Sequence, residues 1–413
     1  MNVNDLKSAE FLAELTYLYG EDRCEAQAER YVDLYAEHVH AYGAEPCFVS
    51  APGRIEICGN HTDHNHGKVL CAALTVDTLA CVSPADGFVE INSRGYSPFR
   101  VDLNDLSVRE EDKGTSAALV RGVADWFVNN GYKVGGFVAN TTSDVFKGAG
   151  VSSSAAFEVL IGKIFSTEFN DDKVTDVELA YAAHHAETVH FGKPCGLLDQ
   201  MAIALGGVSY IDFKDPASPE IKTVNADFSK MGIVLTNTGG DHSNLTEHYA
   251  SIRLEMEAVA KQFGKSCLRE VCEEEFYSKI KEISSNVTKR AILRAIHFYN
   301  ENRRVDSAFN ALREGDAEAF FRAENESGIS SYTLLQNCYV PGSGEQPIPL
   351  GLALAERAGA RAKRVHGGGF AGTVLAFSDK EGTATLAGAM ADTFGEDSVY
   401  VLSIRPCGAK KIG

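Results

Sequence analysis

A glycine-serine segment is the strongest chemical feature of the sequence. It reads Gly148-Ala149-Gly150-Val151-Ser152-Ser153-Ser154 and opens an apolar run of helical character. The glycines let the backbone approach a ligand closely, and the free N–H groups and positive dipole end of a helix start favour anions. The segment therefore predicts a phosphate cradle, although a tight turn with a single serine cap is the plain structural alternative. It is not a P-loop, because GxxxxGK[ST] is missing.

Two carboxylates follow this segment. Glu187 lies on a helix expected from the capping box Thr175-x-x-Glu178 to about His190, and Asp199 follows the loop Cys195-Gly196. Near a phosphate loop, one acid can hold Mg²⁺ and the other can accept a proton or orient a hydroxyl. Taken alone, either residue is typical of a solvated surface.

A polar segment, Arg54–His66, packs one arginine, four acidic or amide side chains and three histidines behind Pro52-Gly53. We interpret it as a loop that binds hydroxyl groups, because aspartate accepts two hydrogen bonds from neighbouring hydroxyls. A metal site built from its histidines and Asp63 is the alternative, but the spacing matches no tetrahedral zinc pattern.

Two other patterns match known motifs only in part. Gly367–Gly372 fits GxGxxG, yet Thr373–Phe377 continues as a strand where a dinucleotide site needs a helix. A glycine hairpin packed on other backbone, or on the phosphate loop, is therefore predicted. His185-Ala-Glu187 with Pro194-Cys195 is similar to a zinc deaminase signature, but Leu198 stands in the place of its second cysteine.

The elements that must position these residues alternate along the chain. Periodicity and turn signals predict a mixed α and β protein with two halves, a cleft between them, and a linker at Asp212–Pro219. Helices are expected at 8–42, 116–129, 245–262, 274–282, 289–301 and 317–327, and strands at 47–50, 69–82, 136–141, 232–236, 363–365 and 373–377.

Composition limits the partners. The 413 residues carry a net charge of −18, which repels nucleic-acid phosphates and anionic membranes. The longest apolar runs fall short of the roughly 18–20 residues of a membrane span, and the ten cysteines form no CxxC pair. We expect a cytoplasmic protein with reduced thiols and no nucleic-acid or membrane partner. The chain is long enough to fold as a monomer, but the sequence does not reveal its oligomeric state.

In combination, the motifs resemble the galactokinase family of the GHMP small-molecule kinase superfamily over nearly the whole chain. The family pattern GRxNLIGEHTDYxxG is matched by GRIEICGNHTDHNHG at 53–67, and PxGxGLSSSAA by FKGAGVSSSAA at 146–156. CGLLDQ at 195–200 matches CGxxDQ, GGGFAGT at 367–373 matches GGGFGGC, and Tyr249 matches a tyrosine of the sugar pocket.

The resemblance implies an α+β fold with a ribosomal S5-like half (1–215), a ferredoxin-like half (216–413), and last strands, about 395–413, that return to the first half. It implies an ATP-dependent sugar 1-kinase whose first-choice substrate is galactose. Asp199 would be the base or anionic orienter, Arg54 would keep it ionised, and 148–154 would cradle the phosphates. Ser154 and Glu187 would bind Mg²⁺, and the sugar would be held by Asn60, His61, Asp63, Gly196 and Tyr249.

One departure from the family bears on the substrate. Asn60 stands where the family has a glutamate associated with the C6 hydroxyl, and Glu56 stands where it has an asparagine. The two positions are about 13 Å apart in an extended chain, so Glu56 is not expected to replace the missing acid unless the loop folds back. A neutral amide makes galacturonate or a related hexose derivative an alternative substrate. A non-catalytic sensor of sugar and ATP is an alternative of another class, which the intact Ser-Ala-Ala after the serine run disfavours.

Overall fold

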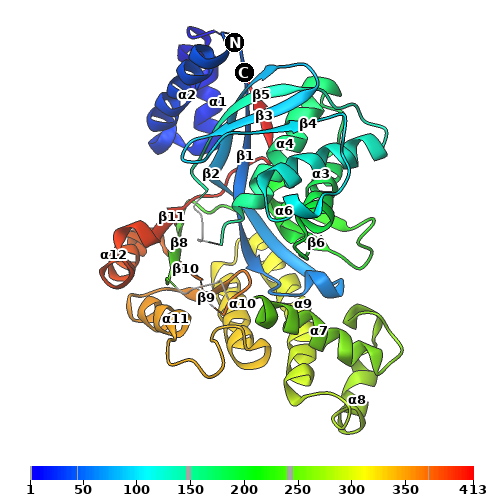
Figure 1. Ribbon diagram of the computed structural model, residues 1–413. Coiled ribbons are helices and arrows are strands. Elements are labelled where there is room, and N and C mark those ends of the chain that lie inside the picture. The colour runs from blue at the N-terminus through cyan, green and yellow to red at the C-terminus, as the bar shows by residue number, and fades with distance from the viewer. Residues whose placement is uncertain (1, 44, 146–149, 240–244, 371) are drawn as a thin grey trace.

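The computed structural model describes residues 2–43, 45–145, 150–239, 245–370 and 372–413. Within these residues the strands form an eight-stranded and a four-stranded sheet, each with its own helices. Figure 1 shows the first sheet in the upper half of the molecule and the second below it. The mixed α+β architecture with two halves is therefore confirmed. Among the described residues, no helix has the length and apolar character to cross a membrane.

The first sheet has the order β12-β1-β2-β5-β3-β4. In addition, β6 pairs with β2, and β7 pairs with β6. β1 is longer than the predicted 47–50, because its pairing with β2 resumes after a register shift between Pro52 and Arg54. The strands are β1 Cys47–Cys58, β2 Lys68–Pro84, β3 Phe88–Ser93, β4 Phe99–Asp102, β5 Phe137–Ser143, β6 Val208–Asp212, β7 Glu220–Val224 and β12 Lys410–Ile412.

Helices cover both faces of this sheet. The expected helix over 8–42 is two helices, because Gly20 (φ 85°) ends the first one in a conformation that suits glycine. Both pack on one face of the sheet, and four further helices pack on the opposite face. The helices are α1 Ala9–Tyr19, α2 Glu21–Tyr42, α3 Ser116–Asn129, α4 Ser153–Phe169, α5 Asp176–His185 and α6 Leu198–Leu205, with a π-helical turn, Ala186–Phe191, after α5.

The second sheet has the order β11-β8-β10-β9, and its chain order is strand, helices, strand, strand, helix, strand. This is the ferredoxin-like arrangement. Its strands are β8 Met231–Asn237, β9 Ala362–His366, β10 Thr373–Asp379 and β11 Val399–Leu402. Its helices are α7 Thr246–Lys261, α8 Glu273–Ile283, α9 Lys289–Glu314, α10 Ala317–Ser330, α11 Pro347–Arg357 and α12 Thr383–Phe394.

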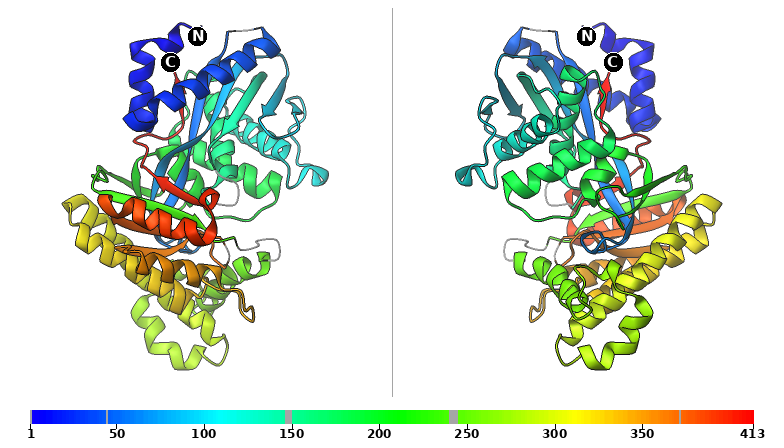
Figure 2. Two further views of the ribbon diagram at one scale, coloured as in Figure 1. Left: turned by 90° about the vertical axis from the view of Figure 1, so that its left-hand side faces the viewer. Right: turned by 90° about the vertical axis from the view of Figure 1, so that its right-hand side faces the viewer.

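The connection between the sheets differs from the expected linker. Residues 213–219 form the turn between β6 and β7, which pair with each other, so the chain leaves the first sheet only after Val224. Polar turn residues signal a loop, but not which strands the loop joins. At the other end of the chain, β12 pairs with β1, and both termini lie close together (Figures 1 and 2).

A buried carboxylate ties the terminal segments to the first sheet. Asp77 on β2 is fully buried and accepts hydrogen bonds from Tyr19 of α1 (2.6 Å) and Arg30 of α2 (2.6 Å). Arg405, on the segment that leads to β12, lies 3.4 Å from the same carboxylate. Two cations thus compensate the desolvation of one anion, which couples α1, α2 and the C-terminal segment.

Candidate active site

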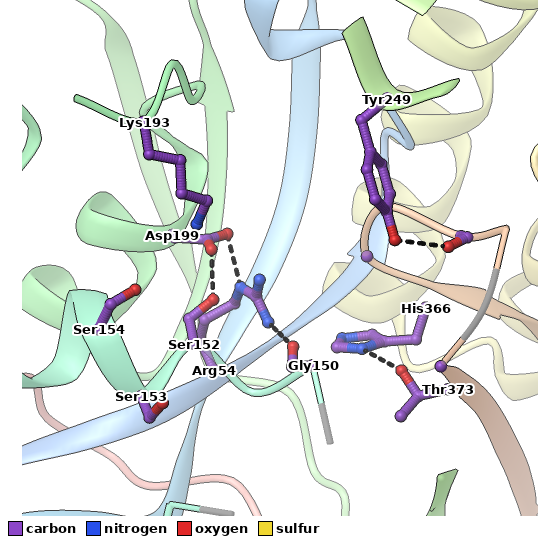
Figure 3. A pocket seen from close by; sticks show the side chains of 14 residues that line it. Arg54, Gly150, Ser152, Ser153, Ser154, Lys193, Asp199, Tyr249, His366 and Thr373 are labelled. Carbon is purple, nitrogen blue, oxygen red and sulfur yellow. Dashed lines mark hydrogen bonds and ion pairs between the residues drawn. The ribbon is translucent and has the colours of Figure 1, made fainter. Parts of the chain in front are cut away.

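A cavity of about 300 Å³ lies between the two halves of the protein (Figure 3). Segments that are far apart in the sequence form its walls. The first half contributes Arg54, Gly150, Ser152, Ser153, Ser154, Lys193 and Asp199, and the second half contributes Tyr249, His366, Gly367, Gly368, Gly369, Gly372 and Thr373. The predicted phosphate loop, arginine and aspartate therefore surround one cavity. Gly148 and Ala149, also predicted for the loop, lie outside the described residues.

Arg54 and Asp199 are in direct contact at the floor of this cavity. Arg54 follows the register shift in β1, and its Nε donates to Asp199 Oδ1 at 2.7 Å. A second guanidinium nitrogen donates to the Gly150 carbonyl, and the Ser152 hydroxyl donates to the other Asp199 oxygen. The Arg54 side chain is 6% exposed, whereas that of Asp199, at 35%, remains open to the cavity.

The electrostatics keep Asp199 ionised. Burial raises the pKa of the Asp199 carboxyl, but the positive charge of Arg54 and the hydrogen bonds from Arg54 and Ser152 outweigh burial, so the pKa lies below its ordinary value. At neutral pH this site presents an anionic oxygen that is already oriented by two donors.

The loop before α4 adopts a left-handed turn. Gly150 has φ 70° and Ser152 has φ 58°, while Val151 between them is fully buried and anchors the loop. A Cβ on Gly150 would lie 2.8 Å from the Thr373 hydroxyl oxygen, at the end of the glycine hairpin. The predicted packing of that hairpin on other backbone is confirmed, because a Cβ on Gly369 would overlap the Asn337 carbonyl oxygen, while Thr373 at its end contacts the phosphate loop. The N–H groups of the first turn of α4 lie beside Ser153 and Ser154 at the cavity wall.

Ser154 and Glu187 also meet. The Ser154 hydroxyl donates to Glu187 Oε1 at 3.3 Å, and Gln200 Nε2 donates to Oε2 at 2.7 Å. The π-helical turn places Glu187, which is 3% exposed, next to the start of α4. A hydroxyl and a carboxylate are hard oxygen ligands, so this pair is chemically suited to Mg²⁺.

Lys193 is a cavity residue that the sequence analysis missed. Its Nζ donates to Glu187 Oε1 at 2.8 Å, and its side chain is 59% exposed. Figure 3 shows Lys193 on the same side of the cavity as Asp199. Burial lowers the pKa of the Lys193 ammonium, but the Glu187 carboxylate raises it by more. The pKa therefore lies above its ordinary value, and the group stays positively charged. No motif marks Lys193. The available signal was its position, two residues before Cys195-Gly196 in a segment already assigned to the site.

Asp63 and Gly196 lie against each other beside Asp199. The Asp63 carboxylate accepts from the His64 N–H at 2.9 Å, and a Cβ on Gly196 would overlap it, so only glycine fits there. Burial, with smaller contributions from the charges of Asp199 and Glu56, raises the pKa of Asp63 to about 6. Asp63 is thus an acceptor whose charge depends on pH near neutrality.

Asn60 is fully buried and hydrogen-bonded within the protein. Its Nδ2 donates to Glu56 Oε1 (2.9 Å) and to the Gly367 carbonyl (2.8 Å), and its Oδ1 accepts from Asn337 Nδ2 (2.8 Å). The segment does fold back, because β1 ends at Cys58 and the chain turns at Gly59 (φ 107°), which brings the Glu56 and Asn60 side chains into contact. Glu56 is also neutralised by Arg364 at 2.6 Å, so neither side chain presents a free charge to the cavity.

His61 connects the two halves, and Tyr249 contacts the glycine hairpin within the second half. Burial lowers the pKa of His61 to about 4, so the ring is neutral. Its Nε2 atom lies 3.0 Å from the Gly368 carbonyl oxygen, and its Nδ1 atom lies 3.3 Å from His64 Nε2. Both ring nitrogens of His61 are thus engaged within the protein. Tyr249 on α7 lines the cavity, and its hydroxyl donates to the Gly369 carbonyl at 3.0 Å.

The fold and the site together define a class of protein. A ferredoxin-like half closes a cavity over a serine-rich helix start. The sequence model of the GHMP kinase N-terminal domain matches residues 118–207. The protein is therefore a GHMP kinase. The model of the galactokinase galactose-binding signature matches residues 36–84. The chain is 32% identical over 377 residues to galactokinase of Homo sapiens, covering 89% of this chain and 93% of that protein. It belongs to the galactokinase family and is a sugar kinase.

Other comparisons agree. Galactokinase of Clostridium tetani is 32% identical over 355 residues, or 84% of this chain and 88% of that protein. The crystal structure of Lactococcus lactis galactokinase complexed with galactose superposes with a TM-score of 0.79 at 24% identity, covering 92% of this chain and 99% of that chain. Methanococcus jannaschii mevalonate kinase shares the fold at a TM-score of 0.63 and 14% identity, with coverage of 88% and 99%.

Proposed function

We propose that the protein transfers the γ-phosphoryl group of ATP to the anomeric hydroxyl of galactose. The observation that carries the proposal is the ionised Asp199, which Arg54 and Ser152 hold at one side of the cavity while the start of α4 faces the same space. A sugar hydroxyl at Asp199 and a terminal phosphate at the helix start would then be neighbours. The galactose bound to the L. lactis relative supports the choice of sugar.

Asp199 would act mainly by orienting the attacking hydroxyl. A carboxylate with a lowered pKa is a weak base, and phosphoryl transfer passes through a loose transition state in which the hydroxyl proton is lost late. Arg54 would stabilise the charge that develops on the transferred group and keep Asp199 ionised.

Ser154 and Glu187 would hold Mg²⁺, since their oxygens meet at the phosphate side of the cavity. The ion would neutralise part of the negative charge of the phosphates during transfer. Lys193 lies at the same Glu187 oxygen, so we propose that its ammonium balances Glu187 and turns toward the phosphates when they bind.

Asp63, Gly196 and Tyr249 would hold the sugar. Asp63 offers an anionic acceptor, Gly196 leaves room for it, and Tyr249 lines the cavity. Asn60 and His61 would act by fixing the loop that carries Asp63, because their hydrogen bonds join this loop to the glycine hairpin.

All ten cysteines are described and free, which fits a reducing compartment that contains ATP, so we place the reaction in the cytoplasm.

A substrate panel tests the proposal. ADP release is measured with galactose, galacturonate and N-acetylgalactosamine, and the highest kcat/KM is expected for galactose. Turnover of galacturonate without turnover of galactose would contradict the proposed substrate. Asp199→Ala should abolish ADP release while an exposed acid, Asp379→Asn, serves as the matched control. Undiminished turnover in Asp199→Ala would refute the proposed mechanism.

A further inference from the structure

A second cluster of possible metal ligands lies on the first half, apart from the residues that line the cavity. It consists of Asp125 on α3, His185 at the end of α5 and His190 in the π-helical turn. Asp125 Oδ2 lies 2.9 Å from His185 Nε2 and 3.3 Å from His190 Nε2. All three ligand atoms lie within 4.8 Å of one another.

The π-helical turn creates this cluster. His185 and His190 are five residues apart, a spacing that places two side chains about 140° apart around a regular α-helix. In the wider π turn, whose hydrogen bonds run from i to i+5, the two side chains lie closer to one face, and the ring centroids are 5.5 Å apart. Such turns are rare and occur frequently at functional sites.

Contacts within the protein hold the three ligand atoms close to one another. Both imidazole Nε2 atoms contact the same Asp125 oxygen, and Asn129 Nδ2 donates to the other oxygen at 2.9 Å, which fixes the carboxylate. Outer partners of this kind are common around metal sites. His190 is 2% exposed, whereas the other two ligands remain about one-quarter exposed. Arg121, the neighbouring cation, is paired with Asp112.

The donor set indicates the kind of ion. Bonds of about 2.0–2.1 Å in a tetrahedron place ligand atoms roughly 3.4 Å apart, close to the two Asp–His distances. Two imidazoles and one carboxylate suit zinc, with the fourth position open to water, and do not suit Mg²⁺.

We infer that Asp125, His185 and His190 form a zinc-binding site. Glu187 lies between the two histidines in the sequence, on the same π-helical turn. Zinc bound to this turn holds the backbone that positions Glu187, and so it couples a surface site to the phosphate side of the cavity.

Zinc binding to the full-length protein tests the inference. The protein is stripped with a chelator and titrated calorimetrically with zinc alone, without sugar or nucleotide, so the result does not depend on the kinase activity. We expect one zinc ion per chain at this site and a loss of affinity of about tenfold or more in both His185→Gln and Asp125→Asn. An exposed histidine of α2, His40→Gln, is the matched control and should bind as the unmodified protein does.

A second measurement follows the turn itself. Zinc should slow hydrogen exchange of the amides at 186–192 in the unmodified protein and in His40→Gln, but not in His185→Gln. Absence of zinc binding, or equal affinity in His185→Gln and the unmodified protein, would overturn the inference. Equal affinity would place the ion elsewhere, for example at His61 and His64.

Discussion

Replacement of Arg54 should reduce kcat far more than it changes KM. The guanidinium makes two charged hydrogen bonds, to Asp199 Oδ1 at 2.7 Å and to the Gly150 carbonyl, and it is 6% exposed. Removing one group that stabilises the charge of a transition state costs about 2.7–4 kcal/mol. Water can enter the cavity in Arg54→Ala and replace part of this stabilisation, so we take the lower end, about 3 kcal/mol, which corresponds to a decrease of roughly 10²-fold in kcat.

Steady-state ADP release at saturating sugar and ATP measures this effect. Arg54→Lys keeps the charge but not the two-pronged geometry, so its kcat should fall between those of Arg54→Ala and the unmodified enzyme. Arg313→Ala, which removes an arginine that is 59% exposed, should leave both constants unchanged. An Arg54→Ala enzyme with raised KM and normal kcat would refute the reasoning, because Arg54 would then contribute equally to substrate and transition-state binding.

Three further predictions concern charge. The pKa of Asp63 is raised to about 6, so its anionic form is lost as the pH falls; KM for galactose should rise about tenfold by pH 5, and Asp63→Asn should abolish this dependence. Lys193→Met frees the Glu187 oxygen, and the lysine side chain is 59% exposed although Glu187 is buried. The apparent Mg²⁺ affinity should therefore increase two- to fivefold while ADP affinity without Mg²⁺ decreases, and unchanged titrations would contradict the role of Lys193. Asp77→Asn leaves Arg30 and Arg405 without their buried anion. It should lower the free energy of unfolding, measured by denaturant titration, by about 3–5 kcal/mol. A loss below about 1 kcal/mol would show that the ion pairs are not coupled to folding.

Local sequence signals predicted elements whose ends depend on local residues. The helix at 116–129 and the capping box at Thr175 are observed as predicted, because caps and periodicity act within a few residues. The helix expected at 289–301 continues to Glu314. Its polar stretch after Glu301 resembles a helix end, but Arg304 pairs with the buried Glu301 at 2.6 Å, and that burial comes from the surrounding fold.

The sequence alone determined which chemical groups this protein has and the order in which its motifs occur, since composition, caps and motif spacing are properties of the chain. Only the tertiary structure decided which atoms face the cavity. Asn60 and His61 share a motif with Asp63 but bond within the protein, whereas Lys193 belongs to no motif and reaches Glu187. The physical reason is that pairings between distant segments, such as β1 with β2 and the glycine hairpin with the phosphate loop, set the direction of each side chain.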